Sequence, residues 1–155
     1  MTTMRRQGVY ISTKVFENIN CVFRTWDAEH PKDRMLKAHH LKLRVVFECH
    51  YLDQGFIILN DDHDCLKEFV KMLDRHFNNK TVVALDDPEM SIFQALDHKG
   101  VIFLSTLPNV SPEKIAEEVF NWFKVWLINS GLIERVDVRS VEVTDNGQHA
   151  ASYVE

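Results

Sequence analysis

The sequence has few cysteines, glycines and prolines, and each scarcity excludes a class of protein. Its three cysteines (Cys21, Cys49 and Cys65) are an odd number without Cys-x-x-Cys spacing, which indicates reduced thiols rather than a disulfide framework. The 155 residues contain only 5 glycines and 4 prolines, and no Gly-, Ser- or Pro-rich linker divides them. We therefore predict a single domain over residues 1–155.

Long apolar runs and an excess of basic residues are also missing. No apolar run is long enough to cross a bilayer, and none follows the two arginines near the start, so neither a membrane span nor a signal peptide is predicted. The 18 Lys and Arg are scattered and outnumbered by 23 Asp and Glu, for a net charge of -5. This balance argues against binding to nucleic acid. We expect a cytoplasmic protein without a membrane or nucleic-acid partner.

The apolar pattern changes period along the chain, from that of strands to that of helices. It predicts strands over 9–26, 41–51, 82–85, 101–104 and 136–143, with a bulge near Ser140 in the last strand. It predicts helices over 66–77, 93–96 and 111–130, with Asp61 or Asp62 capping the first and Ser111 capping the third. This order favours an α+β fold in which helices cover one face of an antiparallel sheet.

The second predicted strand carries the most informative motif. Its apolar residues alternate from Leu41 to Cys49, and it begins with the adjacent pair His39 and His40. This segment resembles the His-Gly-His-(Ser/Asn)-Tyr-Arg-Val-x-Val strand of the 6-pyruvoyl- and 6-carboxy-tetrahydropterin synthase family. Other segments resemble that family in order and spacing: 55–58, 73–75, 86–88, 111–116, 141–145 and 151–153.

The resemblance implies the tunnelling fold. In that fold each subunit contributes a four-stranded antiparallel sheet with two main helices on one face, and subunits join edge to edge into a barrel. It further implies a homo-oligomer, specifically a hexamer, with ligand sites between subunits.

The same alignment replaces most of the chemistry of the family. Of the three positions that bind zinc in the family, one is His39, while the other two are Phe23 and Leu41. Phenylalanine and leucine have no donor atom, and a single imidazole binds zinc weakly, so no metal or cofactor is expected. His40 is adjacent to the one retained position.

The catalytic positions are also replaced. Arg34 and Met35 occupy the place of the family's cysteine, and Asn78 and Asn79 occupy the place of its Asp-His pair. Asparagine has no titratable group with which to act as a general base. The alignment therefore assigns no catalytic residue, and three other candidates are considered. They are Asp74 and His76, from an alternative alignment, and Cys21, which could pair with His39 as a relic nucleophile.

One binding position is retained in kind. Asp145 aligns with the glutamate that anchors the pterin in the family, and a carboxylate can accept two hydrogen bonds from the N–H edge of a 2-amino-4-oxo ring. Asp145-Asn146-Gly147 is also a turn signal, so a purely structural role is the alternative. We predict a ligand site for a pterin- or purine-like ring formed by Asp145, Thr144, Asn78 and Asn79.

Three hypotheses follow. The first is a homologue of the family that has lost zinc-dependent catalysis and binds a pterin- or purine-like ring. The second is an active synthase-type lyase with a relocated site at His39, His40 and His76, with or without zinc. The third is a structural or interaction protein of the same fold without a small ligand.

Overall fold

The computed structural model describes residues 8–58 and 63–155. The strands are β1 (Tyr10–Phe23), β2 (Lys37–Cys49), β3 (Lys80–Ala84), β4 (Leu104–Leu107), β5 (Val136–Asp145) and β6 (His149–Val154). The helices are α1 (His63–His76), α2 (Met90–His98) and α3 (Pro112–Asn129), with short 3₁₀ helices η1 (Pro31–Arg34) and η3 (Leu132–Glu134). The predicted caps Asp61 and Asp62 lie outside the described residues. No helix in the described part of the chain is long and apolar enough to span a membrane.

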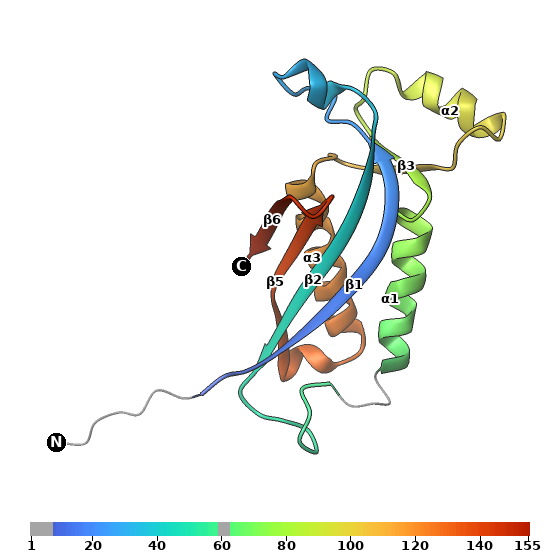
Figure 1. Ribbon diagram of the computed structural model, residues 1–155. Coiled ribbons are helices and arrows are strands. Elements are labelled where there is room, and N and C mark those ends of the chain that lie inside the picture. The colour runs from blue at the N-terminus through green and yellow to red at the C-terminus, as the bar shows by residue number, and fades with distance from the viewer. Residues whose placement is uncertain (1–7, 59–62) are drawn as a thin grey trace.

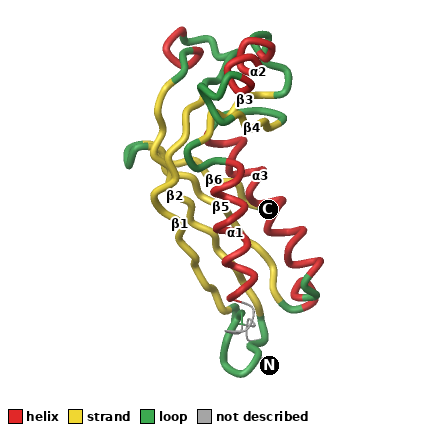
Figure 2. The backbone as a smooth tube through the Cα atoms, turned by 90° about the vertical axis from the view of Figure 1, so that its right-hand side faces the viewer, coloured by secondary structure: helices red, strands yellow, loops and turns green. Residues whose placement is uncertain are grey.

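The strands form one mixed sheet in the order β4-β3-β1-β2-β5-β6. Strands β1, β2, β5 and β6 are antiparallel neighbours, whereas β3 and β4 run parallel to β1 and to each other. Helices α1 and α3 lie side by side against one face of the long strands (Figures 1 and 2). The predicted α+β class, with helices covering one face of the sheet, is confirmed.

The number of strands in the sheet corrects the prediction of four. The segment Val82–Ala84 is buried throughout, as in a parallel strand covered on both faces, and β3 joins the edge of β1 at Cys21–Phe23. Strand β4 begins at Leu104, where the strand predicted over 101–104 ends. The start of the predicted range is held at the end of α2, because the N–H of Val101 donates to the Leu96 carbonyl at 2.9 Å. The chain also continues past the last predicted strand into β6.

The hairpin between β5 and β6 explains that extra strand. Asn146 and Gly147 form its turn with φ of 51° and 69°, the left-handed pair that a tight hairpin turn requires. The turn signal was therefore read correctly, but its consequence, a strand running back along β5, was not predicted.

The second strand behaves as its pattern predicts. The side chains of Leu41, Leu43, Val45 and Phe47 are fully buried. The predicted bulge is also confirmed, since Val46 pairs with Ser140 but Phe47 pairs with Val138, which leaves Arg139 without an opposite residue.

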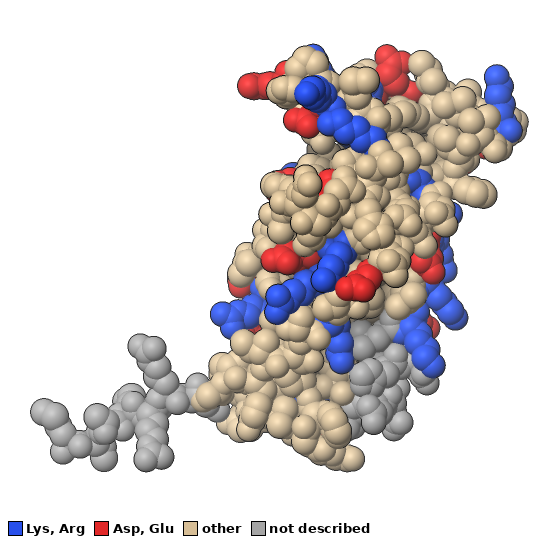
Figure 3. Space-filling model, viewed as in Figure 1, with Lys and Arg blue, Asp and Glu red and all other residues tan. Residues whose placement is uncertain are grey.

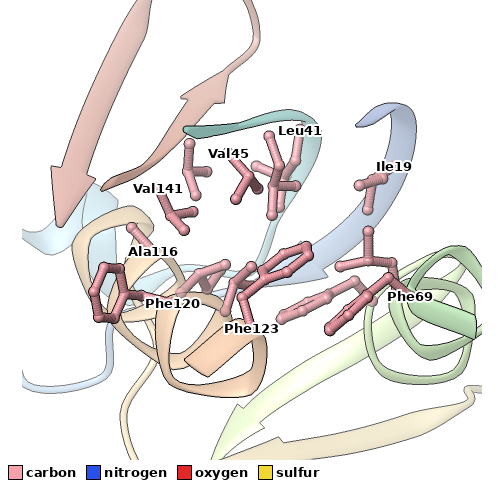
Figure 4. Close-up of a cluster of buried hydrophobic side chains, with 14 of the residues drawn as sticks. Ile19, Leu41, Val45, Phe69, Ala116, Phe120, Phe123 and Val141 are labelled. Carbon is pink, nitrogen blue, oxygen red and sulfur yellow. The ribbon is translucent and has the colours of Figure 1, made fainter. Parts of the chain in front are cut away.

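The core lies between the sheet and the two long helices. Helix α3 begins at its predicted cap, where the Ser111 hydroxyl accepts the N–H of Lys114 at 3.1 Å. Its buried face includes Phe120 and Phe123, and the Phe123 ring stacks on Phe69 of α1 with centroids 3.9 Å apart (Figure 4). This packing holds the N-terminus of α3 beside the ends of β2 and β5, where the candidate site lies.

The helix-free face of the sheet is polar and carries charges of both signs. Positive and negative side chains are interspersed over the strands seen in Figure 1, as the space-filling view shows (Figure 3). Lys42 lies 3.5 Å from Glu17, and Arg139 lies 3.8 Å from Glu48. This face therefore differs from the helix-covered face, as expected for an antiparallel sheet with one buried side.

Candidate functional site

A hydrogen-bonded pair joins the start of β2 to the end of β5. Nδ1 of His39 lies 2.7 Å from Oδ2 of Asp145, and their side chains are only 12% and 13% exposed. The pair forms because Leu41 pairs with Asp145 across the two strands, so that both side chains reach the helix-covered side. The second carboxylate oxygen, Oδ1, is buried and has no hydrogen-bond partner among the described residues. A buried acceptor without a donor is costly, and a bound ligand with an N–H group could supply that donor.

The ring of Phe23 covers one face of the His39 imidazole. The two rings stack with centroids 3.6 Å apart and an interplanar angle of 4°. Phe23 is itself 3% exposed and lies at the end of β1, two residues after the direct ladder partner of His39, Cys21. The imidazole is thus fixed by a stacked ring and by a carboxylate.

The thiol of Cys21 is buried in the same region. Burial, together with the nearby Asp145 carboxylate, raises the pKa of Cys21 to about 12. A thiol with such a pKa is almost entirely protonated at neutral pH, and no hydrogen bond joins it to His39 among the described contacts. The arrangement does not favour the relic nucleophile considered for Cys21.

The pair faces a cavity of about 550 Å³. The cavity is enclosed by the β1–β2 connection, the N-terminus of α3 and the β5–β6 turn. Its lining residues include Phe23, Arg24, Met35, Lys37, His39, Glu113, Asp145 and His149. A second imidazole–carboxylate contact lies at its wall, where Nε2 of His149 is 3.4 Å from Oε1 of Glu113. Charged groups of both signs thus surround a space large enough for a small ring compound.

The donor atoms present do not fit a zinc centre at the position that the resemblance implies. Leu41 is fully buried in the core, and Phe23 stacks on His39 without any donor atom to offer. Nδ1 of His39 is already engaged with Asp145. Over the side chains that the structure describes, at 8–58 and 67–155, no group of three or more His, Cys, Asp and Glu is placed to hold a metal ion. The zinc content of the protein stays a prediction.

The asparagines after α1 tie that helix to β1. The side-chain oxygen of Asn78 accepts the N–H of Asn20 at 3.1 Å, and the N–H of Asn79 donates to the Asn20 carbonyl at 2.6 Å. Asn78 also donates to Oδ1 of Asp74 at 3.2 Å. Neither Asn78 nor Asn79 lines the cavity at Asp145, so the structure does not gather the predicted ring site in one subunit.

His76, the centre of the relocated-site hypothesis, packs elsewhere. Its ring centroid lies 4.9 Å from that of Trp122 on α3, and burial, followed by the charge of Arg75, lowers its pKa. The structure does not bring His76 to His39 and His40. The imidazole of His40 instead lies 2.5 Å from the side-chain oxygen of Asn20.

Thr144 is also separated from Asp145. Successive side chains of a strand point to opposite faces, and Thr144 pairs with Lys42 while Asp145 pairs with Leu41. Thr144 therefore does not line the cavity. Met35, at the position of the family's cysteine, does line it, whereas Arg34 contributes its carbonyl oxygen to Arg24 at 3.2 Å.

Sequence reasoning missed an ion pair that shapes the cavity. Arg24 donates to both carboxylate oxygens of Asp87, with distances of 3.0 and 2.6 Å. Burial opposes ionisation of Asp87, but the hydrogen bonds from Arg24 and from the Glu89 N–H outweigh it, so the pKa of Asp87 is lowered. The neighbouring Asp-Asp-Pro motif was the available signal. In the sequence this motif indicates only the end of the apolar segment 82–85, and nothing local marks Asp87 as the partner of Arg24.

Comparison with known proteins defines the class of fold. No protein-family model matches the sequence, and no curated protein matches it. An uncharacterized protein from Wolinella succinogenes superposes with a TM-score of 0.80 at 18% identity, covering 95% of this chain and 98% of that one.

Two enzymes of known name have the same fold. The 6-pyruvoyl tetrahydropterin synthase of Plasmodium vivax matches with a TM-score of 0.61 at 16% identity, covering 94% of this chain and 98% of the enzyme. That of Caenorhabditis elegans matches with a TM-score of 0.59 at 13% identity, covering 98% and 99%. The chain therefore has the fold of the 6-pyruvoyl tetrahydropterin synthases, the tunnelling fold that the sequence resemblance implied.

Proposed function

We propose that this protein is a tunnelling-fold homologue that binds a pterin- or purine-like ring through Asp145 and lacks the zinc-dependent lyase reaction. One observation carries the proposal: a buried carboxylate whose Oδ2 is held by His39 while Oδ1 has no partner, at the wall of a cavity of about 550 Å³. An unpaired acceptor in such a place is suited to the N–H edge of a 2-amino-4-oxo ring.

The His39–Asp145 bond supports this role by orienting the carboxylate. With Oδ2 fixed at 2.7 Å from Nδ1, rotation of the carboxylate is restricted, so Oδ1 is held in one position. Such preorganisation reduces the ordering that binding requires. Aspartate is one methylene shorter than the glutamate of the family, so the ring must lie closer to β5 or bind through a bridging water.

The loss of lyase chemistry is supported by the replaced side chains. Leu41 and Phe23 have no lone pair with which to bind zinc. Met35 has a thioether and cannot act as a thiolate nucleophile. Asn78 and Asn79 cannot accept a proton at neutral pH. We further propose that the protein acts as a homo-oligomer, a hexamer, in the cytoplasm.

Titration by intrinsic pterin fluorescence and by calorimetry tests the proposal. We expect neopterin or guanosine to bind and adenosine, which lacks the 2-amino-4-oxo edge, to bind weakly. The variant Asp145→Asn should weaken binding by about tenfold or more, the value of a hydrogen bond to a charged group. Glu142→Gln, on the opposite face of the same strand, is the matched control and should bind as the parent does.

The metal content of the same preparation completes the experiment. We expect far less than one zinc per chain. About one zinc per chain, removed by a chelator together with lyase activity on dihydroneopterin triphosphate, would contradict the proposal. Failure of every ring to bind would instead support the structural or interaction protein.

A further inference from the structure

A second cavity lies on the other side of the His39 position and shares only His39 and Asn146 with the first. Its volume is about 500 Å³. It is formed where β1 and β2 meet the start of β3 and the loop before β4. Its lining residues are Asn20, Cys21, Val22, Ala38, His39, His40, Asn79, Lys80, Thr81, Val101, Ile102, Phe103 and Asn146.

The charge of this cavity differs from that of the chain. No aspartate or glutamate lines it, although the chain has a net charge of -5 and the first cavity contains three carboxylates. Lys80 and two histidines are its ionisable groups besides the thiol of Cys21. A site without carboxylates and with a fixed cation attracts an anion.

The Lys80 ammonium is held in place without a counterion. It lies 4.8 Å from the centroid of the Phe103 ring, a cation–π contact. Among the described residues, no carboxylate lies within ion-pair distance of it. The Phe103 ring thus orients the Lys80 ammonium, and the neighbouring side chains offer it no anionic partner.

Large apolar side chains are exposed to solvent at the rim of the cavity. Phe103 is 68% exposed and Val101 is 66% exposed. Both precede β4 in a segment whose backbone is fixed, since the Phe103 carbonyl accepts the N–H of Thr81 at 2.8 Å. Exposed apolar side chains on a rigid backbone can contact a flat ring.

Hydrogen bonds that involve side chains fix the polar residues of the cavity wall. Asn20 and His40 face each other across the β1–β2 ladder, with 2.5 Å between the imidazole Nδ1 and the amide oxygen. The side-chain oxygen of Asn146 accepts the N–H of His40 at 2.9 Å. Asn79 and Asn146 both have left-handed backbones, with φ of 60° and 51°. Asparagine tolerates this conformation at turns, so these two residues border the cavity from the α1–β3 and β5–β6 connections.

We propose that this second cavity binds a small planar aromatic anion, whose ring contacts Phe103 and Val101 and whose carboxylate or phosphate pairs with Lys80. The site is distinct from the proposed ring site at Asp145, since it uses charge of the opposite sign. The two cavities share His39 and Asn146, but the anion proposal does not use Asp145, so the Asp145→Asn variant separates the two proposals.

Ligand-detected NMR and calorimetry with simple probes test it. The probes are 2-naphthoate and phenyl phosphate as the anions, 2-naphthamide as the neutral analogue of the first, and inorganic phosphate as the anion without a ring. We expect saturable binding of at least one aromatic anion, with weaker binding of 2-naphthamide and of inorganic phosphate.

Variants locate the binding. Lys80→Met should weaken it by about tenfold, the value of one charge-assisted hydrogen bond, and Phe103→Leu should also weaken it. Both side chains lie at the rim, so the fold is expected to survive, as circular dichroism can check. Lys99→Met, an exposed lysine outside the cavity, is the control and should bind as the parent does.

Three results with these probes and lysine variants would overturn the proposal. They are the absence of saturable binding by either aromatic anion, equal weakening by Lys80→Met and Lys99→Met, and binding of 2-naphthamide as tight as that of 2-naphthoate. Asp145→Asn should leave binding of the anion intact. Loss of anion binding in that variant would place the anion in the first cavity and would also overturn the proposal.

Discussion

At the scale of single residues, the chain places two retained side chains in a new relation. His39 aligns with a zinc ligand and Asp145 with a ring anchor, yet here they bond each other at 2.7 Å. Phe23 stacks on the imidazole, where the alignment puts another zinc ligand. The result is a buried His39–Asp145 pair beside the Phe23 ring, in which Oδ1 of Asp145 can still accept a hydrogen bond from a ligand.

The reactivity of Cys21 is a prediction at this scale. Because its pKa is raised to about 12, only about one part in ten thousand of the thiol is ionised at pH 8. We expect iodoacetamide at pH 8 to label Cys21 very slowly in the folded protein and rapidly after unfolding in guanidinium. Peptide mapping by mass spectrometry follows this cysteine separately from the others. Equally rapid labelling in both states would restore the relic-nucleophile hypothesis.

At the scale of elements, one ion pair links three segments around the first cavity. Arg24, at the end of β1, bonds Asp87 before α2 and the carbonyl of Arg34 in η1. Its guanidinium also lies 5.9 Å from the centroid of the Phe93 ring on α2. Phe93 is the buried residue of α2, so these contacts add to the hydrogen bond from the Leu104 N–H to Oδ1 of Asp97 in attaching α2 to the sheet.

Removing this carboxylate should destabilise the fold. The Asp87 side chain is 1% exposed, and breaking a buried pair leaves an uncompensated charge, so Asp87→Asn should lower the free energy of unfolding by roughly 3 kcal/mol. Because the folded pKa of Asp87 lies below its ordinary value of 3.8, its contribution is present above that value and is lost as pH falls through the lowered pKa. Denaturation in urea at pH 7 and at decreasing pH measures both effects.

The neighbouring Asp86 is the control for that measurement. It is exposed and accepts one hydrogen bond, from Nε1 of Trp26 at 3.2 Å, so Asp86→Asn should change stability by less than about 1 kcal/mol. Equal effects of the two substitutions would show that the Arg24 pair is not special.

At the scale of the whole molecule, strands β1 and β6 have outer edges that are unpaired over much or all of their length. Over the described residues, β1 has a neighbour on its outer side only at Cys21–Phe23, and β6 has β5 as its one neighbour. Exposed apolar residues lie on both, including Ile11 at 52% and Val154 at 63%. Unpaired edges with apolar side chains favour pairing with another chain.

Assembly of this kind is testable by light scattering coupled to size-exclusion chromatography. We expect a homo-oligomer, and the resemblance implies a hexamer. A lysine on an edge strand opposes pairing, so Val154→Lys should shift the protein toward smaller species. Val70→Lys, on an exposed position of α1, should leave the mass unchanged. A monomer at all concentrations in the parent chain would contradict the prediction.

Local sequence patterns were sufficient to predict many elements of the fold. The alternation from Leu41 to Cys49, the cap at Ser111 and the slip near Ser140 each act within a few residues, so they could be read from the sequence. The apolar segments at 82–85 and 101–104 also predict strands, but their place in the sheet, parallel to β1, could not be read, because short buried segments carry no pattern that names their neighbours.

The sequence by itself determined which side chains were available: one imidazole where zinc would need three donors, and a carboxylate at the end of β5. Only the tertiary structure decided how they meet. His39 and Asp145 are 106 residues apart, and the β2–β5 register brings them within a hydrogen bond. The ring of Phe103 and the ammonium of Lys80 likewise meet only because β3 and β4 pair, and such pairing depends on the packing of the whole chain.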